Sequence, residues 1–330
     1  MEKIKQKAFT FDDVLLLPRF TNFLPSEANL ETKISRNITL KIPLVSAAMD
    51  TVTESRMAIA LAENGGIGII HKNNSIEEQA QQVKAVKKYE SGVVRDPTTI
   101  KSTKTIEELM QLTNELSISG MPVVDDGVLM GIVTRRDFRY ADNLADPVST
   151  IMTPRDKLIT VEEGTDQAEV KKLMYNNRIE KILVIDGAGM LAGLVTMKDM
   201  EKSAEYPFAT KDLKGQLRVG AALGTGPDTL DRATALAAAG VDLFVVDSAH
   251  GHSQNVIDTI KILKIEFPAI DIMAGNVSTP EGAIALRDAG ADAIKIGMGP
   301  GSICTTRIIA GIGVPQITAI LSIKEKFQSN

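Results

Sequence analysis

The sequence has no tryptophan, and aromatic residues make up only 4% of its 330 residues. Proteins that bind single-stranded nucleic acid use aromatic side chains as stacking platforms. The chain also has no basic stripe, and its net charge is −5. It contains no run of 18 or more apolar residues, which a membrane-spanning helix needs. These absences predict neither a nucleic acid partner nor a membrane partner.

Signals for secretion and for disulfide bonding are also missing. The first residues, Met1–Lys7, are charged and lack the apolar segment of a secretory signal. The chain has one cysteine, Cys304, so no internal disulfide can form, which fits a reducing compartment. We therefore expect a cytoplasmic protein.

The single cysteine lies in a glycine-rich segment, G-M-G-P-G-S-I-C-T-T-R (297–307). Glycine has no Cβ, so such a segment allows a ligand to approach the backbone closely. A lone cysteine is most often a small buried hydrophobe. Here its neighbours Ser302 and Thr306 do not suit a core strand, and Arg307 would favour the thiolate. The pattern predicts that Cys304 is a catalytic nucleophile, the alternative being a buried structural thiol.

Short apolar runs alternate with alanine-rich helical stretches such as 231–239 and 280–289. Continuous apolar runs are typical of parallel strands that are buried on both faces. Polar residues follow several of the runs, where a (β/α)₈ TIM barrel keeps its chemistry. We therefore predict an α/β fold of this barrel type. The predicted strands are 43–49, 65–70, 217–223, 241–247, 270–274 and 291–297.

An internal repeat interrupts this pattern between residues 92 and 203. Residues 120–137 align with residues 180–199, and each copy reads as a strand, an Asp-Gly turn, a strand and then Thr-x-x-Asp entering a helix. An Asp-Gly pair between two strands is a strong hairpin signal.

Several motifs together resemble the inosine 5′-monophosphate (IMP) dehydrogenase family. Besides the cysteine segment, they are A-F-T-F-D-D-V-L-L-L-P (8–18), P-L-V-S-A-A-M-D-T-V-T-E (43–54), G-G-I-G-I-I-H-K-N (65–73), D-S-A-H-G-H-S (247–253) and A-G-N-V (274–277). The sibling family, GMP reductase, shares the cysteine segment.

The internal repeat resembles a tandem pair of CBS modules, named for cystathionine β-synthase. By this resemblance the modules occupy 92–150 and 151–203, inserted between barrel parts 1–91 and 204–330. The dehydrogenase carries such an insert after its second barrel strand, whereas GMP reductase typically lacks it. On this ground we expect a dehydrogenase, with a GMP reductase relative as the alternative.

The resemblance implies NAD-dependent oxidation of IMP to xanthosine monophosphate (XMP), in guanine nucleotide biosynthesis. Cys304 would form a covalent thioimidate with the purine, which water then hydrolyses, while NAD carries the hydride. Ser302 would contact the substrate phosphate, and Thr306 would lie near the hydrolytic water. Ser46 and Met49 would line the nucleotide pocket.

The cofactor site is expected near Asp247, which ends an apolar run and thus stands at the barrel rim. A carboxylate there can hold the ribose hydroxyls of NAD, as the resemblance implies, although a helix N-cap is the alternative. Ser248 and Asn276 are further candidates. Gly297, Met298 and Gly299 would let the cofactor come close.

The resemblance also implies a potassium ion (K⁺) bound by the backbone carbonyls of Gly299, Gly301 and Cys304. The alternative is that the glycines only shape the turn. His250 and His252 lack the partners of a metal site.

In nucleotide-binding CBS modules the Thr-x-x-Asp positions meet a ribose, so purine nucleotides are expected there. The same residues fit a capping box equally well. A regulatory nucleotide-binding module on a non-catalytic chain is the alternative function. The residues are Thr134, Asp137, Thr196 and Asp199.

The resemblance stops after Ile320, and residues 321–330 could begin a helix. Six strands are predicted where a closed barrel has eight. We therefore expect a chain truncated by a frameshift, by fragmentation or naturally, with negligible turnover by itself. The complete family is expected to form a homotetramer.

Overall fold

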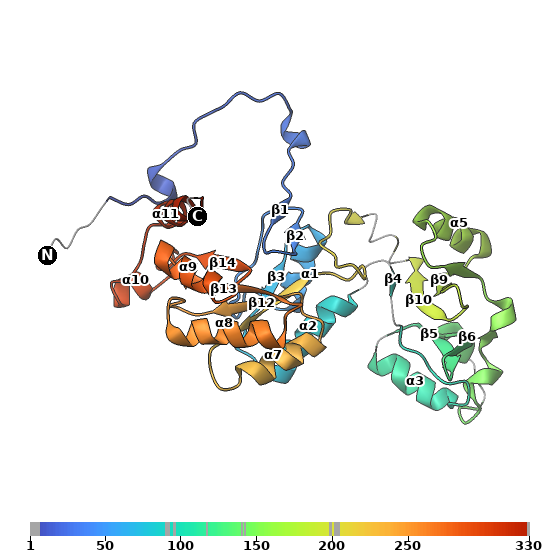
Figure 1. The fold of residues 1–330 in the computed structure, drawn as a ribbon. Coiled ribbons are helices and arrows are strands. Elements are labelled where there is room, and N and C mark those ends of the chain that lie inside the picture. Colours follow the sequence, from blue (N-terminus) through green and yellow to red (C-terminus); the bar gives the residue numbers. More distant parts are fainter. Residues whose placement is uncertain are drawn as a thin grey trace. The chain divides into compact units, whose positions relative to one another are not determined.

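The computed structural model describes residues 7–89, 93–94, 97–116, 118–139, 141, 143–197, 200 and 205–328. The chain divides into two compact units (Figure 1). The first comprises Met1–Tyr89, Phe208–Asp212 and Gln216–Asn330, and the second comprises Glu90–Pro207 and Leu213–Gly215.

The first unit is built on a five-stranded sheet with the order β14-β13-β12-β11-β3. All neighbouring strands are parallel, which confirms the predicted α/β class. The strands are β3 (Gly68–Ile70), β11 (Val219–Leu223), β12 (Leu243–Asp247), β13 (Asp271–Val277) and β14 (Ala293–Ile296).

The first predicted strand, 43–49, is wrong as a regular strand. It forms one parallel bridge, between Val45 and Ile67. Leu44 and Val45 remain about half exposed. This segment has a strand partner on one side only within the described residues, so its backbone leaves the sheet after a single bridge.

Helices cover one face of the sheet, and the alternation of side chains along each strand explains how. Phe244 and Val246 of β12 pack into a core shared with the helices, whereas Leu243 and Val245 belong to a second cluster on the opposite face. The second cluster also contains Ile38, next to the short hairpin β1 (Thr32–Lys33) and β2 (Thr39–Leu40). The covering helices are α1 (Ser55–Glu63), α2 (Ile76–Lys88), α7 (Thr229–Ala238), α8 (Gln254–Glu266) and α9 (Pro280–Asp288).

Buried carboxylates tie the amino-terminal ends of the strands together. Two βα units share the pattern Ala-Gly-x-Asp, in which glycine with positive φ follows the helix end (Gly240 at +87°, Gly290 at +110°). Asp242 then accepts a hydrogen bond from the Val219 N–H (2.9 Å), and Asp292 accepts one from the Ile272 N–H (3.0 Å). The repeated aspartate therefore fixes each strand to its neighbour.

The second unit contains two sheets, which share a small cluster of Leu129, Leu183 and Leu194. One sheet has the order β5-β6-β7 and the other β4-β10-β9-β8. The strands are β4 (Val93–Val94), β5 (Gly120–Asp125), β6 (Val128–Thr134), β7 (Thr153–Pro154), β8 (Thr160–Glu162), β9 (Lys181–Ile185) and β10 (Leu191–Thr196). The helices are α3 (Ile106–Glu115), α4 (Arg135–Phe138) and α5 (Gln167–Asn177).

Both predicted hairpins of the repeat are present, but their turns differ. Asp126 and Gly127 both have positive φ (48° and 88°), as a two-residue type I′ turn requires. In the second copy the positive φ falls on Gly189 (78°), and Asp186 Oδ1 accepts the backbone N–H groups of Ala188 and Met190. The second Asp-Gly pair therefore begins a longer turn in which the aspartate side chain bonds to the backbone.

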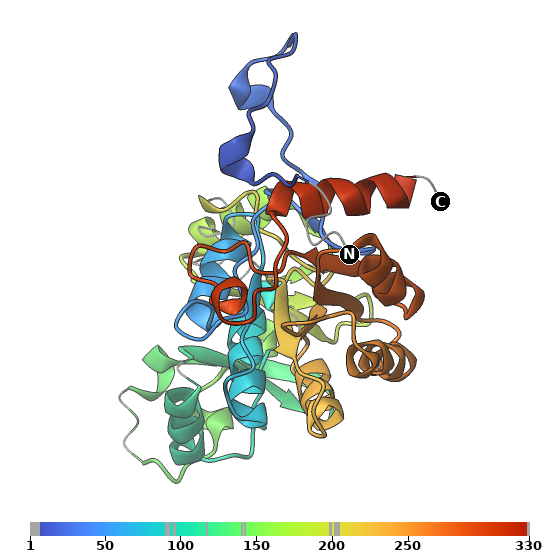
Figure 2. The ribbon, with the colours of Figure 1, turned by 90° about the vertical axis from the view of Figure 1, so that its left-hand side faces the viewer.

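The ends of the first unit lie against each other. An N-terminal arm, residues 8–30, holds two short 3₁₀ turns (Phe11–Asp13 and Pro25–Glu27) and exposes Leu15 and Leu16 almost completely. Its beginning lies beside α11 (Gln316–Gln328) in both views (Figures 1 and 2). The helix expected from Leu321 is thus present but begins five residues earlier, at Gln316. In the described part of the chain, no helix is long and apolar enough to cross a membrane.

Candidate active site

Cys304 lies in the long connection between β14 and α11, just before the short helix α10 (Thr306–Ile309). Its backbone N–H donates to Gly301 O (3.0 Å), and its side chain is partly exposed. Ser302 and Ile303, at the tip of the same turn, are exposed. The thiol is therefore accessible and does not belong to the buried core.

Hydrogen bonds at this turn stabilise the thiolate. The Thr306 hydroxyl and then the Thr306 backbone N–H lower the pKa of the Cys304 thiol below its ordinary value. Partial burial acts in the opposite direction, while the Gly299 N–H and the Arg307 charge add to the lowering. A lowered pKa is the condition under which a cysteine reacts as the thiolate nearer to neutral pH.

A chain of hydrogen bonds joins the carboxyl ends of β12, β13 and β14. Asn276 N–H donates to Ser248 O (2.8 Å), and Ser248 N–H donates to Gly275 O (3.0 Å). The Asn276 side-chain amide then donates to Gly297 O (2.9 Å), where the cysteine connection starts. Since the strands are parallel, these predicted cofactor residues share one edge of the sheet, which we call the carboxyl edge.

Asp247 ends β12 at the same edge and is held by two lysines. Lys295 Nζ contacts Asp247 Oδ1 (2.7 Å), and Lys72 Nζ donates to Asp247 O (2.7 Å). The alternative of a helix N-cap is wrong, because Ser253 caps the following helix α8. Neither lysine was predicted, although a charged residue inside the apolar run A-I-K-I (293–296) was a signal for Lys295.

Ser46 and Met49 lie at the other end of the sheet, beyond β3. Ser46 N–H donates to Ile67 O (3.1 Å), and Met49 is 43% exposed. No hydrogen bond among the described residues joins them to the cysteine connection. The buried Ser46 Oγ and Asn276 Oδ1 have no hydrogen-bond partner within the described chain. Such buried polar atoms usually bind a water or a ligand.

The carbonyls expected to hold potassium lie in tightly packed backbone. A Cβ on Gly299 (φ +78°) would stand 2.8 Å from Ile312 O and 2.9 Å from Gly313 Cα. Gly299 is therefore required for packing whether or not a cation binds. The donors proposed for potassium are carbonyl oxygens, the ligand type suited to hard cations. Among the described residues, no group of three His, Cys, Asp or Glu side chains is placed to hold a metal.

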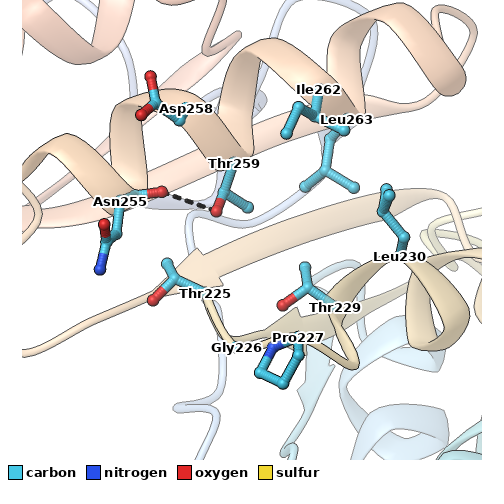
Figure 3. Close-up of a pocket in the computed structure, with 10 residues that line it drawn as sticks. All are labelled: Thr225, Gly226, Pro227, Thr229, Leu230, Asn255, Asp258, Thr259, Ile262 and Leu263. Atoms are coloured by element: carbon cyan, nitrogen blue, oxygen red, sulfur yellow. Dashed lines mark hydrogen bonds between the residues drawn. The ribbon is translucent and has the colours of Figure 1, made fainter.

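A pocket of about 280 Å³ lies between the start of α7 and α8 (Figure 3). Leu223 pairs with Val246, so the residues after β11 begin level with Asp247. Thr225 and Thr229 face the first turns of α8 across the pocket, and the lining contains no lysine or arginine. Thr229 Oγ1 is buried and has no hydrogen-bond partner within the described residues.

In the second unit, the first Thr-x-x-Asp pair forms a local cap. The Thr134 N–H and the Thr134 hydroxyl both donate to Asp137 Oδ2 (2.7 and 2.8 Å). These bonds form the capping box that the sequence offered as the alternative to ribose binding. Thr196 is the last residue of β10, and Asp199 lies outside the described residues.

A parallel α/β sheet with an accessible thiol in a glycine-rich connection at its carboxyl edge is the arrangement expected of an enzyme with a cysteine nucleophile. The family described as "IMP dehydrogenase / GMP reductase domain" matches residues 8–330. The chain belongs to this family of oxidoreductases. It is 51% identical to the inosine-5′-monophosphate dehydrogenase of Haemophilus influenzae over 96% of its length, and 50% identical to that of Escherichia coli over 99%.

These matches span 65% and 67% of the two relatives' own lengths. Among solved structures, a GMP reductase from Trypanosoma brucei in complex with guanosine 5′-triphosphate superposes with a TM-score of 0.84 and 40% identity. That match covers 98% of this chain and 79% of the reductase, so it includes the second unit. The expectation that the insert excludes a reductase is therefore wrong. Sequence identity, which is higher to the dehydrogenases, is the better discriminator.

Proposed function

We propose that this protein catalyses the NAD-dependent oxidation of IMP to XMP, with Cys304 as the nucleophile. The observation that carries the proposal is the accessible Cys304 thiol. Hydrogen bonding by Thr306 lowers the pKa of this thiol, although burial opposes the lowering. The 50–51% identity to IMP dehydrogenases supports the choice of substrate.

The residues present support a two-stage reaction. The Cys304 thiolate adds to carbon 2 of the purine, and that carbon then loses its hydrogen as hydride. NAD, when bound, accepts the hydride. Water then attacks the same carbon, and the carbon–sulfur bond breaks to release XMP and the thiol. Thr306, the leading cause of the lowered pKa of Cys304, would orient this water, and Ser302 at the exposed tip would meet the substrate phosphate.

The carboxyl edge fits a dinucleotide. Oδ1 of Asp247 forms the ion pair with Lys295, which leaves the second carboxylate oxygen to accept a hydrogen bond from a ribose hydroxyl. Asn276 Oδ1 offers an unused acceptor on the same edge, and Ser248 lies in the hydrogen-bond chain between them. The pocket between the start of α7 and α8 is lined by Asp258 and by no cationic side chain, so it suits a ribose or base rather than a phosphate. Gly297, Met298 and Gly299 form the approach, and the carbonyls of Gly299, Gly301 and Cys304 are the proposed potassium ligands.

The direct test measures NADH absorbance with IMP, NAD and potassium chloride, comparing the wild-type protein with Cys304→Ser. Because the 330-residue chain is expected to turn over negligibly by itself, the comparison is made in a protein of the relatives' full length, where we expect NADH from the wild type and none from the variant. As a matched control, Ser302→Cys/Cys304→Ser restores a thiol two positions away and should stay inactive. Consumption of NADPH with GMP, and no NADH from IMP, would instead identify a GMP reductase.

We further propose that the first unit is part of a (β/α)₈ barrel and the second a tandem CBS pair that binds purine nucleotides. The support is the internal repeat, with its two hairpins and paired Thr-x-x-Asp sequences. The likeness to a reductase structure bearing guanosine 5′-triphosphate adds to it. Calorimetry of the whole chain should show heat with ATP or GTP, reduced in Thr134→Val. Absence of heat with every purine nucleotide would reject this proposal. Assembly into a homotetramer is proposed from the family alone.

A further inference from the structure

Lys295 is a charged residue within the otherwise apolar strand β14. Its neighbours Ile294 and Ile296 pack against the core that the sheet shares with its helices, so Lys295 projects from the opposite face. The side chain is only 34% exposed there. An ammonium group that has lost much of its hydration costs stability unless an opposite charge compensates it. A specific partner is therefore expected on this face of the sheet.

Asp247, at the end of β12, is that partner. Leu243 and Val245 belong to the cluster on this face, and Asp247 follows them in the same alternation. The register pairs Asp247 with Gly275 of β13, and Gly275 with Lys295 of β14. The three residues thus stand side by side across three neighbouring strands. The ion pair between Lys295 Nζ and Asp247 Oδ1 (2.7 Å) therefore crosses β13.

Gly275 makes this crossing possible. Neighbouring strands are about 4.8 Å apart, so the two strands that the ion pair joins are separated by roughly 10 Å, which an extended lysine nearly spans. A Cβ on Gly275 would stand 2.7 Å from Lys295 Cβ and 2.5 Å from Lys295 O, closer than packing allows. Because glycine has no side chain, the path of the lysine over β13 stays open. The ion pair thus depends on a glycine in the middle strand as well as on its two charged residues.

The two lysines at Asp247 hold different atoms of this residue. Lys72 Nζ donates to the main-chain carbonyl (2.7 Å) and so fixes the backbone at the end of β12. Lys295 bonds to the carboxylate, and the aspartate side chain is 25% exposed. The last torsion angle of an aspartate side chain has a broad preference, so a carboxylate at the end of a strand can rotate unless a partner holds it. Lys295 therefore sets the orientation of the carboxylate.

We propose that Lys295 is a positioning residue for cofactor binding, which holds the Asp247 carboxylate in the orientation that meets a ribose hydroxyl of NAD. The inference rests on the proposed function, in which Asp247 holds this ribose. Lys295 acts through Asp247 and does not contact the cofactor. Its contribution to NAD affinity should therefore vanish when the Asp247 carboxylate is absent. This dependence distinguishes a positioning residue from one that contacts NAD or only stabilises the fold.

The test is a double-mutant cycle on NAD affinity, measured by isothermal titration calorimetry with the 330-residue chain. Lys295→Met keeps the length of the side chain and removes its charge. We expect the Kd for NAD to rise about five-fold in Lys295→Met and about ten-fold in Asp247→Asn. The double variant should also stay at about ten-fold, whereas independent effects would multiply to about fifty-fold.

Lys264→Met is the matched control, because Lys264 forms a similar ion pair with Asp292, just before β14 begins (2.6 Å, lysine side chain 29% exposed). This variant should lower the melting temperature and leave the Kd for NAD unchanged. An unchanged Kd in Lys295→Met, an equal rise in Lys264→Met, or multiplied effects in the double variant would overturn the inference and leave the cofactor site standing.

A wild-type chain that does not bind NAD would overturn the proposed cofactor site and this inference together. If Lys295→Met does not fold, Lys295→Gln removes the same charge and takes its place in the cycle. The Kd should again rise in the single variant and not multiply in the double variant, and an unchanged Kd in Lys295→Gln would equally overturn the inference.

Discussion

The two edges of the parallel sheet in the first unit use their polar residues in opposite ways. The end of the sheet at which the parallel strands begin is here called the amino edge. There the Asp242 and Asp271 side chains are buried, and each accepts several hydrogen bonds. At the carboxyl edge, Ser46, Asn276 and Gln316 each leave a buried oxygen without a partner within the described residues. Unpaired buried polar atoms cost stability, so a fold keeps them where a ligand pairs with them. From this comparison we propose that the amino edge serves stability and that the carboxyl edge binds ligand.

The largest effect is expected at the amino edge for Lys87→Met. Lys87 Nζ lies 2.9 Å from both Asp212 and Asp242, and its side chain is only 7% exposed. Burial raises the pKa of Asp242, and the charge of Lys87 opposes that rise. Without Lys87 the buried carboxylate keeps only the more distant Arg218 (Nη1–Oδ1 3.4 Å) as counter-ion, and breaking a buried pair in this way costs about 3–5 kcal/mol. Urea unfolding at neutral pH measures this loss, and it should shrink in acid, where Asp242 becomes protonated.

A smaller loss of stability, about 1–3 kcal/mol, is expected for Asp271→Asn. Burial raises the pKa of Asp271, but hydrogen bonds from Ser35 and Asn37 outweigh it and leave the pKa lowered. A lowered folded pKa stabilises the protein above the ordinary pKa of aspartate, about 4, and this contribution is lost as pH falls through the folded value.

The difference in unfolding free energy between wild type and Asp271→Asn should therefore be full at pH 7 and decrease below about pH 4. Asp288→Asn, at an exposed position on α9, serves as the control and should leave stability within about 0.5 kcal/mol of the wild type. If either amino-edge variant kept its stability but changed Cys304 alkylation, the division between the two edges would be wrong.

At the carboxyl edge, Asp247→Asn should change binding and leave stability intact. Asparagine carries no charge, so it can form neither the ion pair with Lys295 nor a charge-assisted hydrogen bond with a ribose hydroxyl. We expect the KM for NAD to rise about ten-fold, with the melting temperature unchanged. Steady-state NADH formation and thermal unfolding measure the two quantities, again with Asp288→Asn as the control. A lower melting temperature with an unchanged KM would place Asp247 with the structural carboxylates instead.

The smallest effect is expected for Thr306→Val, which keeps the shape of the side chain and removes its hydroxyl. The hydroxyl hydrogen bond is the leading cause of the lowered pKa of Cys304, so the alkylation midpoint should rise. Reactivity at neutral pH should fall about three- to ten-fold. Thr306→Ser retains the hydroxyl and should restore the wild-type profile, whereas Thr305→Val, one position earlier, should not affect it.

The apolar strands and the position of Cys304 outside the core could be predicted from the sequence because their signals are local. Runs such as L-F-V-V (243–246) are long enough to indicate buried strands, and the polar flanks of Cys304 argue against a core position. The same local logic failed for 43–49, where burial depends on a neighbouring strand. Pairing depends on partners that lie far apart along the chain.

Side-chain partners across the sheet could not be predicted for the same reason. The Lys295–Asp247 pair joins residues 48 positions apart, and the Lys72 contact with Asp247 spans 175. The turn after Asp186 carries the same Asp-Gly pair as the first hairpin, yet adopts a different form because its loop is longer.

The most direct test of the division between the edges is whether IMP protects Cys304 from alkylation. The rate of thiol alkylation by iodoacetamide should reach its half-maximum at a lower pH than for a free cysteine. Saturating IMP should slow this reaction at least about ten-fold, because the bound substrate covers the sulfur. The amino-edge variant Asp271→Asn should show the same protection wherever it is folded. An alkylation rate that IMP leaves unchanged in the folded protein would contradict the assignment of the carboxyl edge as the substrate site.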